Sequence, residues 1–434
     1  MNDALEQVVS QAGRTDVAAL LQELVRIPSP TGEEGAVQAL VRERFAGAGL
    51  EVEAFEANLE ELREHPAYSA PRSSLENGYG GRPNVFGRLR GAGGGRSLLL
   101  FCHADTVPPG PRSAWTRDPF GGEVEEGRLY GRGSGDAKSG LAVMIACARA
   151  LKDAGVRLKG DLTLLSTVEE EEGGGGGMLA CVLRGLKADG AVYTHMKPGG
   201  LGGVDIGSGG DVSFRITVPG QAGHKGSAHL FVNAIEKAEY IHAALRELDA
   251  QRAEAVREPL VEKRFEISGL EPRTVNLVVT VIHAGVSIGQ LPAECVLEGV
   301  AGVAPRESLE EVKELVEDHV ARAAAADAWL REHPPRLEWT ERRAEPCLTD
   351  PGHPFVETAL SVAERVTGRP CQRQALNGTT DMRFPVLYGG TPTIMFGGEC
   401  PRGHIPDEFT YIDELRLSVE GLLHLILEWC GVNA

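Results

Sequence analysis

Residues 98–107 read LLLFCHADTV, and this stretch decides the fold. The apolar run predicts a buried strand, and His103 and Asp105 stand at its carboxyl end, one residue apart. In open α/β sheets ligands bind beyond the carboxyl ends of the strands, and a metal-binding histidine usually needs a carboxylate to orient its second ring nitrogen. The stretch therefore predicts an α/β sheet with a polar site at its edge.

Strands and helices alternate on both sides of this run. Helices are expected over residues 17–25, 37–45 and 141–151, and strands over residues 85–89, 97–102, 162–168 and from 191 onward. This alternation is typical of a mostly parallel sheet with helices on both faces. Residues 52–83 are polar and irregular, so we expect a surface loop there, without a chemical role.

A second pattern begins near residue 209. Strands are expected over residues 212–218, 274–282, 295–300 and 337–340, and helices over residues 232–248 and 309–324. Their order, β-α-β-β-α-β, is ferredoxin-like. We therefore expect a discontinuous α/β catalytic domain over residues 1–208 and 345–434, and an inserted α+β domain over residues 209–344.

The bulk composition excludes several classes of function. The chain has 434 residues, 42% of them hydrophobic, and a formal net charge of −18, unlike the basic surfaces that bind nucleic acids. The eight cysteines include no C-x-x-C pair, so we expect reduced core residues and no disulfide framework. The N-terminus shows no basic segment followed by an apolar one, and no apolar run has membrane-spanning length. We therefore expect a cytoplasmic protein that acts on a small molecule and binds neither nucleic acid nor membrane.

Three further segments carry residues that commonly bind metals. Asp136 lies in the glycine-rich run GRGSGDAKSG, four glutamates occupy residues 169–172 after an expected strand, and His404 begins the run HIPDEF. Each has an ordinary structural alternative: a helix N-cap for Asp136, a solvated acidic turn for the glutamates and a loop position for His404. Their combination with His103 favours one shared metal site.

In their order and residue pattern these segments resemble those of the two-zinc amidohydrolase superfamily. That superfamily contains acetylornithine deacetylase, succinyl-diaminopimelate desuccinylase, aminoacylase and the glutamate carboxypeptidases. The resemblance extends to WTRDPF at 115–120, GRLY at 127–130 and VNAIEKA at 232–238. It implies a zinc-peptidase-like catalytic domain and metal-dependent amidohydrolase or metallopeptidase activity. It also implies that the inserted domain serves as a lid and, in many members, as the dimer interface.

The resemblance implies ligands for two divalent ions, zinc in the first place and cobalt or manganese as alternatives. His103 would bind one ion with Asp105 as its orienting carboxylate, and Asp136 would bridge both ions. Counted from the strand, Glu170 is the general base and Glu171 a ligand. Counted back from Gly177, both roles shift by one residue, to Glu171 and Glu172.

His195 departs from the family pattern, which has Glu or Asp followed by Pro at this point. Imidazole is a competent zinc ligand, so we expect His195 to bind the second ion. The alternatives are that Lys197 supplies a cation in place of that ion, which would leave one metal, or that His195 is a surface residue. The expected partition is Glu171, His404 and Asp136 on one ion, and His103, His195 and Asp136 on the other.

Groups that bind substrate are expected in both domains. His224, at the end of PGQAGH, matches the family histidine that stabilises the tetrahedral oxyanion, often from the partner subunit; its ordinary alternative is a turn histidine. The run GTTDMR at 378–383 resembles a loop that borders the substrate pocket, which nominates Thr379, Asp381 and Arg383. Arg383 would either clamp a substrate carboxylate or pair with Asp381.

Two positions that often help bind a substrate carboxylate in relatives are changed here. This chain has Gly289 where many relatives begin an Asn-x-x-Pro turn, and Gly302 where they carry an arginine before a proline. We expect Asn276 and Arg273 to substitute from the neighbouring strand. The change argues against assuming an ordinary N-acyl amino acid as substrate.

These observations predict a homodimeric, dinuclear metal-dependent hydrolase of amide bonds. The favoured activity is an N-deacylase of the acetylornithine deacetylase or desuccinylase type, acting on small N-acyl amino acids or related amides. A dipeptidase or carboxypeptidase is the alternative within the enzyme class. A family member that has lost catalysis and acts as a binding protein is the alternative outside it.

Overall fold

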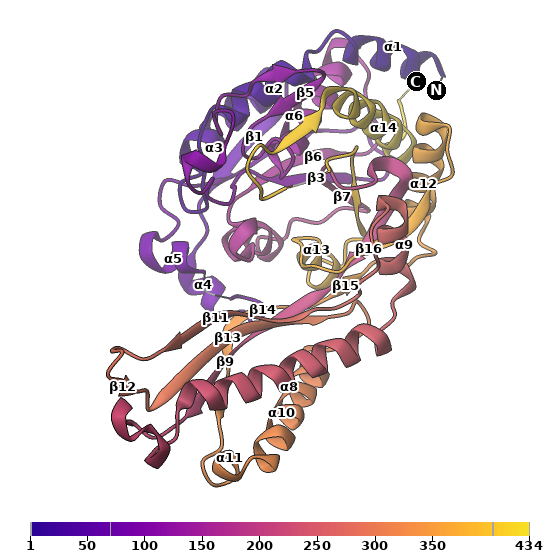
Figure 1. Cartoon of the computed structure of the whole chain (residues 1–434). Helices are drawn as coiled ribbons and strands as arrows, with labels where there is room; N and C mark the ends of the chain where they lie inside the picture. Colours follow the sequence, from indigo (N-terminus) through magenta and orange to yellow (C-terminus); the bar gives the residue numbers. More distant parts are fainter. Residues whose placement is uncertain (1, 70, 402, 434) are drawn as a thin grey trace.

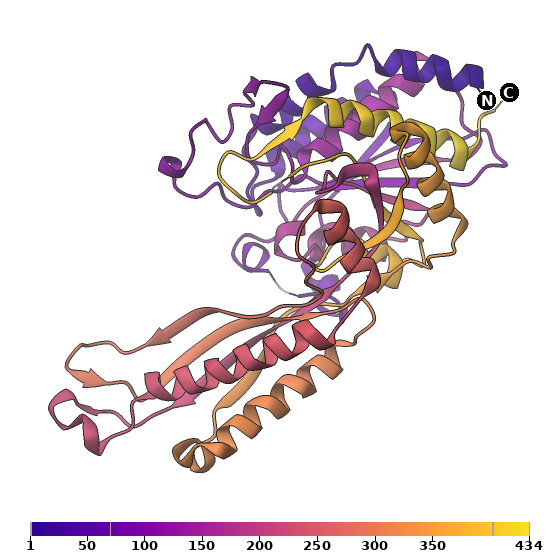
Figure 2. The ribbon, with the colours of Figure 1, turned by 45° about the vertical axis from the view of Figure 1, so that its right-hand side comes forward.

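The computed structural model describes residues 2–69, 71–401 and 403–433. Figure 1 shows a large α/β part that contains both chain ends and a smaller part of strands and two long helices. Figure 2 shows the smaller part projecting from the larger one as an elongated arm. Within the described residues, no helix is both long and apolar enough to cross a membrane.

The large part is built on a nine-stranded sheet. Its order is β1 (Glu51–Phe55), β2 (Asn84–Leu89), β6 (Leu162–Thr167), β3 (Leu98–His103), β7 (Ala191–Thr194), β17 (Thr393–Phe396), β8 (Gly203–Ser208) and β15 (Cys347–Leu348), with β16 (Gln372–Leu376) also paired to β8. The central strands β6, β3, β7 and β17 are parallel, and antiparallel pairs flank them on both sides. The prediction of an α/β fold around a mainly parallel sheet is confirmed.

Helices cover both faces of this sheet because its central strands are apolar on both sides. Every residue of β3 is buried; Leu98, Leu100 and Cys102 face one core, while Leu99 and Phe101 face another. The first core is covered by α1 (Asn2–Ala12), α2 (Val17–Val25), α3 (Gly35–Gly47), α6 (Lys138–Asp153), α12 (Pro354–Thr367) and α14 (Ile412–Cys430). The second is covered by α4 (Leu59–Arg63), η3 (Gly175–Leu179), α7 (Ala180–Leu183) and α13 (Arg383–Leu387).

Residues 52–83 are not the irregular surface loop that we expected. They contain most of β1, all of α4 and α5 (Arg72–Asn77), and the buried side chains of Tyr68, Tyr79 and Arg82. These elements are too short to leave a periodic pattern in the sequence. Their aromatic side chains are buried by contact with the distant segment 174–182, which sequence spacing does not reveal.

The smaller part is a four-stranded antiparallel sheet with helices on one face. Its order is β11 (Leu277–Ala284), β13 (Glu294–Val303), β9 (Gly210–Pro219) and β14 (Arg336–Ala344). Helices α8 (Ala234–Ala255) and α10 (Leu309–Ala326) pack on it through one apolar core, and α11 (Ala328–Glu332) follows α10. This is the ferredoxin-like order of elements. One unexpected helix, α9 (Pro259–Ser268), packs against β16 of the large sheet instead.

The remaining short elements sit at the edges of the two parts. They are the three-stranded sheet of β4 (Val124–Glu125), β5 (Arg128–Tyr130) and β18 (Phe409–Tyr411), the pair β10 (Gly223–His224) and β12 (Gln290–Leu291), and the short 3₁₀ segments η1 (Arg112–Ala114), η2 (Glu170–Glu172), η4 (Gly200–Gly202) and η5 (Lys225–Leu230). The pairing of β5 with β18 matters most, because it holds two loops of the candidate site together.

Candidate metal centre and active site

The candidate metal ligands converge at the carboxyl ends of the parallel strands. His103 ends β3, and the glutamates 169–172 and His195 follow its two neighbours, β6 and β7. Asp136 comes from the loop after β5, and His404 from the loop before β18. The fold therefore brings together five segments that are far apart along the chain, as expected where parallel strands end side by side.

His103 and His195 face the same oxygen of Asp136. Their Nε2 atoms lie 3.1 and 3.0 Å from Asp136 Oδ1. Their Nδ1 atoms contact the backbone carbonyls of Asp105 and Met196. Because a carbonyl only accepts hydrogen bonds, each Nδ1 carries a hydrogen, and Nε2 is the atom that can exchange a proton for a metal ion.

His404 and Glu171 face the other oxygen of Asp136. His404 Nε2 lies 3.2 Å from Asp136 Oδ2 and 3.0 Å from Glu171 Oε1. Possible ligand atoms thus form two groups, each within 4.8 Å: His103, Asp136 and His195, and Asp136, Glu171 and His404. Asp136 belongs to both groups with one oxygen toward each. The nitrogen and oxygen donors suit zinc, and these residues fit two ions bridged by one carboxylate.

The charge states of these groups reflect their close contact. Burial disfavours the imidazolium of His103, yet hydrogen bonds with Asp105 and Asp136 hold its pKa well above the usual value. Burial also opposes the carboxylate of Asp136, but the adjacent His195 and His103 hold its pKa well below the usual value. Hydrogen bonds with Asp136 and Glu171 raise the pKa of His404 to about 10. The cluster thus favours positive charge, which protons or metal ions could supply.

Asp105 holds the glutamate turn as well as His103. Its Oδ1 accepts a hydrogen bond from Glu170 N at 3.1 Å, and its Oδ2 accepts from Glu171 N at 3.2 Å and from Thr31 Oγ1 at 2.8 Å. The same Oδ1 lies 3.3 Å from His103 Nδ1. One buried carboxylate therefore links the strand-end histidine to the backbone of the turn that carries Glu170 and Glu171.

The side chains of the four glutamates point in different directions. Glu171 meets His404, whereas Glu172 Oε2 accepts from Ser73 N at 3.0 Å. Glu170 lines the cavity, and its carboxylate makes no hydrogen bond or ion pair with a described residue. Burial raises the pKa of Glu170, which His103 opposes and Asp136 reinforces. This arrangement supports counting the roles from the strand, with Glu170 as base and Glu171 as ligand.

Glu169 turns away from the cavity into a buried network. It adopts φ +67°, accepts from Tyr79 Oη at 2.9 Å and from Gly176 N at 2.8 Å, and pairs with Arg82 at 3.2 Å. Burial raises its pKa to about 7. Sequence reasoning missed Tyr79 and Arg82, which lie in the segment that we expected to be a loop.

The run of glycines after the glutamates makes this close packing possible. A Cβ atom on Gly174 would stand 1.8 Å from Asp381 Oδ1, and one on Gly176 would stand 1.9 Å from the Tyr79 ring. Larger residues would push these side chains apart. The glycines therefore serve packing behind the site, in agreement with the absence of a phosphate-loop motif from the sequence.

Glu408 fixes the loop that carries Asp136. Its Oε1 accepts hydrogen bonds from Gly133 N at 3.1 Å, Gly135 N at 2.9 Å and Asp136 N at 3.1 Å, and its other oxygen pairs with Arg132. Glu408 follows His404 by four residues, so one segment supplies a candidate ligand and the group that positions another.

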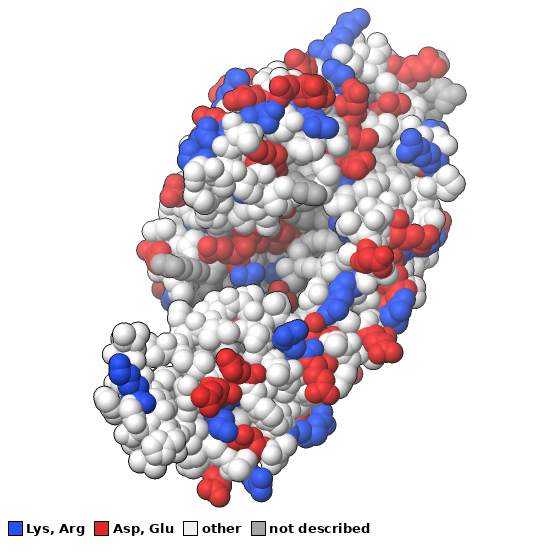
Figure 3. All heavy atoms as spheres, in the orientation of Figure 1, with Lys and Arg blue, Asp and Glu red and all other residues white. Residues whose placement is uncertain are grey.

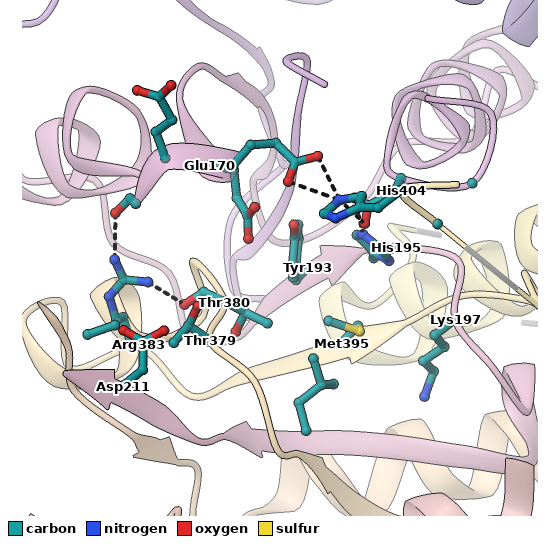
Figure 4. A pocket seen from close by; sticks show the side chains of 18 of the residues that line it. Glu170, Tyr193, His195, Lys197, Asp211, Thr379, Thr380, Arg383, Met395 and His404 are labelled. Carbon is teal, nitrogen blue, oxygen red and sulfur yellow. Dashed lines mark hydrogen bonds and ion pairs between the residues drawn. The ribbon is translucent and has the colours of Figure 1, made fainter. Parts of the chain in front are cut away.

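A cavity of about 320 Å³ opens beside these ligands. Figure 4 shows Glu170, Tyr193, His195 and His404 around it, with Thr379, Thr380 and Arg383 at the opposite side. Lys197 also lines the cavity, but its Nζ donates to Gly203 O and Asp205 Oδ2, away from both ligand groups. The alternative in which Lys197 replaces the second metal therefore receives no support from its position.

Asp381 does not reach the cavity wall. It is buried behind the wall, both of its carboxylate oxygens lack hydrogen-bond partners among the described residues, and burial raises its pKa well above the usual value. Arg383 does not hydrogen-bond with it and instead donates to Thr380 O and Gly173 O. Thr379 and Arg383 therefore stay candidate substrate-binding residues, whereas the structure separates Asp381 from the cavity.

His224 and Asn276 lie outside this cavity. His224 is exposed on β10, which pairs with β12 at the far tip of the smaller part (Figure 1), and its Nδ1 accepts from Gly226 N at 3.1 Å. Asn276 is exposed just before β11, and Arg273 pairs with Asp249 at 2.6 Å. Within one chain, none of the three lines this cavity. Each would need a neighbouring chain or a movement of the smaller part.

The cavity also has lining residues that sequence reasoning missed. They come from the strands that connect the two parts and from α9: Asp211, Arg264, Arg342 and Arg343. No motif marks them, because isolated arginines in a charged sequence are usually solvated surface residues. Only the close approach of β9, β14 and α9 to the large sheet shows their position.

Comparisons with known proteins agree with this geometry. Residues 99–428 match the model described as Peptidase family M20/M25/M40. The N-formyl-4-amino-5-aminomethyl-2-methylpyrimidine deformylase of Bacillus subtilis is 31% identical over 370 residues, which cover 81% of this chain and 84% of that protein. The succinyl-diaminopimelate desuccinylase of Rhodopseudomonas palustris is 28% identical over 411 residues, covering 92% and 95%. A dipeptidase structure from Saccharomyces cerevisiae covers 99% of each chain with a TM-score of 0.72 at 16% identity, which shows the same fold.

Proposed function

Because this chain belongs to Peptidase family M20/M25/M40 and is therefore a metal-dependent hydrolase, we propose that it is a dinuclear N-deacylase of small N-acyl amino acids or related amides. One observation carries the proposal. Asp136 stands between two groups of possible ligands, and the unpartnered carboxylate of Glu170 lies in the same cavity. Each group offers three possible ligands, whereas structural zinc sites usually have four. Three ligands beside the carboxylate of Glu170 are therefore typical of a catalytic site.

The residues of the chain have distinct roles in this proposal. Two divalent ions, zinc in the first place with cobalt or manganese as alternatives, would polarise the amide carbonyl and acidify the attacking water. Glu170 takes the proton of that water and gives it to the leaving nitrogen, a task that its raised pKa suits. Asp105 keeps Glu170 in place through its backbone N–H.

The preference for deacylation rests on relatives. The deformylase and the desuccinylase are both similar to this chain over more than four fifths of its length. A dipeptidase or carboxypeptidase activity stays the alternative within the family. A family member that has lost catalysis and only binds a small molecule is disfavoured, because the candidate base and both groups of possible metal ligands are present.

We further propose that two chains associate through the smaller part, residues 209–344, which forms an inserted domain beside the catalytic residues 1–208 and 345–434. Strand β11 is an edge strand of its sheet, and its side chains Val278 and Ile282 are 47% and 55% exposed. Nearby Val286 and Ile288 are 97% and 98% exposed. Apolar side chains on a free strand edge favour association. Such a dimer would let the tip that carries His224 serve the partner's cavity as oxyanion donor.

A location in the cytoplasm is also part of the proposal. All eight cysteines are buried as thiols, as in proteins kept under reducing conditions.

Metal analysis and a substrate screen test the proposal together. The purified protein is saturated with Zn²⁺, Co²⁺ or Mn²⁺, desalted and analysed for bound metal, then assayed on N-acyl amino acids and dipeptides. We expect two ions per chain and hydrolysis of the N-acyl compounds. A stoichiometry near one would contradict the role of His195. Full metal occupancy without hydrolysis of any amide would support the binding-protein alternative.

A further inference from the structure

The fold does not hold the three candidate metal-binding histidines equally. Figure 3 shows the surface hollowed between the two parts of the chain, with acidic side chains along the upper edge of the hollow. The side chains of His103 and His195 are 0% and 14% exposed, whereas that of His404 is 48% exposed. The Nδ1 atoms of His103 and His195 contact backbone carbonyls, but Nδ1 of His404 has no hydrogen-bond partner among the described residues. The orientation of the His404 ring therefore depends on its backbone.

The backbone of the His404 loop adopts an unusual conformation. His404 has φ +61° and Asp407 has φ +54°, in a left-handed region that residues other than glycine rarely adopt. Residues 403–406 belong to no helix or strand, so no ladder of hydrogen bonds maintains this conformation. Such conformations are costly and persist only where surrounding contacts enforce them. We therefore looked for the contact that holds this loop in place.

One carboxylate ties the loop to a segment about 290 residues away along the chain. Asp407 Oδ1 accepts hydrogen bonds from Thr116 N at 2.9 Å and from Arg117 N at 3.3 Å, and its Oδ2 accepts from Thr116 Oγ1 at 2.8 Å. Hydrogen bonds to a carboxylate are stronger than those between neutral groups, and three of them fix both oxygens. These three hydrogen bonds are called the Asp407 clasp below.

The segment that carries Thr116 is itself anchored in the fold by its neighbour. Trp115 is 5% exposed, and its Nε1 donates to Pro109 O at 2.8 Å. The guanidinium group of Arg132 lies 5.2 Å from the centre of the Trp115 ring, and Arg132 also pairs with Glu408. Because Glu408 holds the loop of the bridging aspartate, the Asp407 clasp ties the histidine loop to the same support.

We propose that Asp407 is a positioning residue, which orients His404 for metal binding through this clasp. The clasp then sets the affinity for the ion bound by Glu171 and His404, and does not affect the ion bound by His103 and His195. The inference rests on the proposed function, because it assumes that both groups of candidate ligands bind metal.

The proposed effect passes through the loop. Neither Asp407 nor Thr116 lines the cavity, so neither is placed to act by touching substrate. Without the clasp, the loop would sample other positions of the His404 ring, and an ion would have to select the one that meets Glu171. Residues that orient a ligand without binding the metal typically contribute about 10–100-fold to metal affinity.

Competition with a chelator tests the proposal on the metal-loaded full chain. It gives the dissociation constant of each ion, with the absorption of bound Co²⁺ as a second measure. Asp407→Gly removes the clasp but suits φ +54°, and it should weaken the ion of Glu171 and His404 by about tenfold or more, leaving the other ion unchanged. Asp407→Asn keeps one acceptor oxygen and also tolerates this conformation, so it should retain part of the affinity.

Two further variants make the comparison specific. Glu171→Gln identifies the ion concerned, because it removes a ligand of that group alone, and the Co²⁺ absorption that it loses should match the absorption lost in Asp407→Gly. Asp118→Gly is the matched control. It removes a carboxylate from the same exposed segment, where Asp118 accepts only from Phe120 N, and both ions should bind as in wild type.

Thr116 tests the clasp from its other side. Thr116→Val keeps the shape of the side chain without the hydroxyl donor and should weaken the same ion by about twofold to tenfold, whereas Thr116→Ser should bind it as wild type does. In the Asp407→Gly background, Thr116→Val should cause no further loss, because the two residues act through one contact. If Asp407→Gly does not fold, the Thr116 pair decides, and equal affinities in Val and Ser would reject the clasp.

The outcomes separate this inference from the proposed function. Wild-type affinity for both ions in Asp407→Gly, in an enzyme that hydrolyses N-acyl compounds, would reject the inference alone. Equal weakening of both ions would also overturn it, since the clasp would then stabilise the fold and not orient His404. Two bound ions, with the expected selective loss in Asp407→Gly but no hydrolysis of any amide, would reject the proposed function alone.

Discussion

The carboxyl edge of the large sheet and the tip of the small sheet each carry a histidine that we assign to the active site, but their surroundings differ. His103 is fully buried and is held by Asp105 and Asp136. His224 is exposed, and the one hydrogen bond that its ring makes with a described residue closes its own turn at Gly226. The sheet edge gathers both groups of candidate ligands within one chain. His224, in contrast, does not line the cavity of the chain that carries it.

The difference indicates which functions one subunit can perform. Buried polar groups must be paired, so the metal end of the cavity is assembled by the fold itself. Exposed groups on an apolar strand edge have no such constraint until another surface covers them. We therefore expect substitutions at the sheet edge to act within a chain and substitutions at the tip to act between chains.

The largest effect on turnover is expected from the candidate general base, Glu170. Glu170→Gln should lower turnover by roughly 10³–10⁴-fold while both metal ions stay bound, because it removes proton transfer without removing a ligand. Steady-state kinetics together with metal analysis measure both quantities. Glu171→Gln should instead lose one ion. If Glu171→Gln keeps both ions and loses turnover while Glu172→Gln loses metal, the count from Gly177 is the right one.

A smaller loss is expected at the tip. His224→Ala should reduce turnover about 10²–10³-fold with metal content unchanged, the usual cost of losing one oxyanion donor. Mixing His224→Ala with Glu170→Gln should restore part of the activity, because a mixed dimer holds one site with both groups intact. Low turnover without complementation would leave closure of the smaller part within one chain as the explanation. Normal turnover in His224→Ala would exclude an oxyanion role.

A substitution on the edge strand β11 tests whether the smaller part acts between chains. Ile282→Arg places a charge at an exposed position of the edge strand β11 and should shift the protein from dimer to monomer, with turnover falling toward that of His224→Ala. Size-exclusion chromatography with light scattering measures the mass. Leu270→Arg, at a residue that is 57% exposed just after α9, is the matched control and should stay dimeric. A wild-type protein that is monomeric at assay concentration would refute the shared site.

The smallest effect concerns a buried group behind the glutamate turn. Burial raises the pKa of Glu34 from about 4.5 to about 7, with Asp105 adding to the shift and Arg82 opposing it. Because the folded pKa is the higher one, the stability linked to this group is full below pH 4.5 and is lost as the pH rises through 7. Glu34→Gln should therefore flatten the fall in stability between pH 5 and 8, by on the order of 1–3 kcal/mol.

Thermal unfolding across that pH range measures the change. Glu33→Gln, at the exposed neighbouring position, should keep the wild-type profile. An unchanged profile in Glu34→Gln would show that Arg82 keeps Glu34 ionised throughout.

Much of the fold and of the metal end was predictable because their signals are local. The apolar run 98–102 predicted a central strand, and the family resemblance drawn from its motifs is confirmed by the match over residues 99–428. The roles of the individual site residues stay predictions. Residues 52–83 were predicted wrongly because Tyr68, Tyr79 and Arg82 are buried only by contacts with segments about 90 residues away along the chain.

By itself, the sequence predicted which residues bind metal and which strand ends present them, because strand periodicity and ligand chemistry act over a few neighbouring positions. Only the tertiary structure decided which glutamate faces His404, that Asp105 holds the glutamate turn, and that Lys197 points away toward Asp205. It also placed Arg342 in the cavity and His224 outside it, on β10. These outcomes depend on how β14, α9 and the glycine run pack against distant elements, and packing between distant elements leaves no periodic trace in the chain.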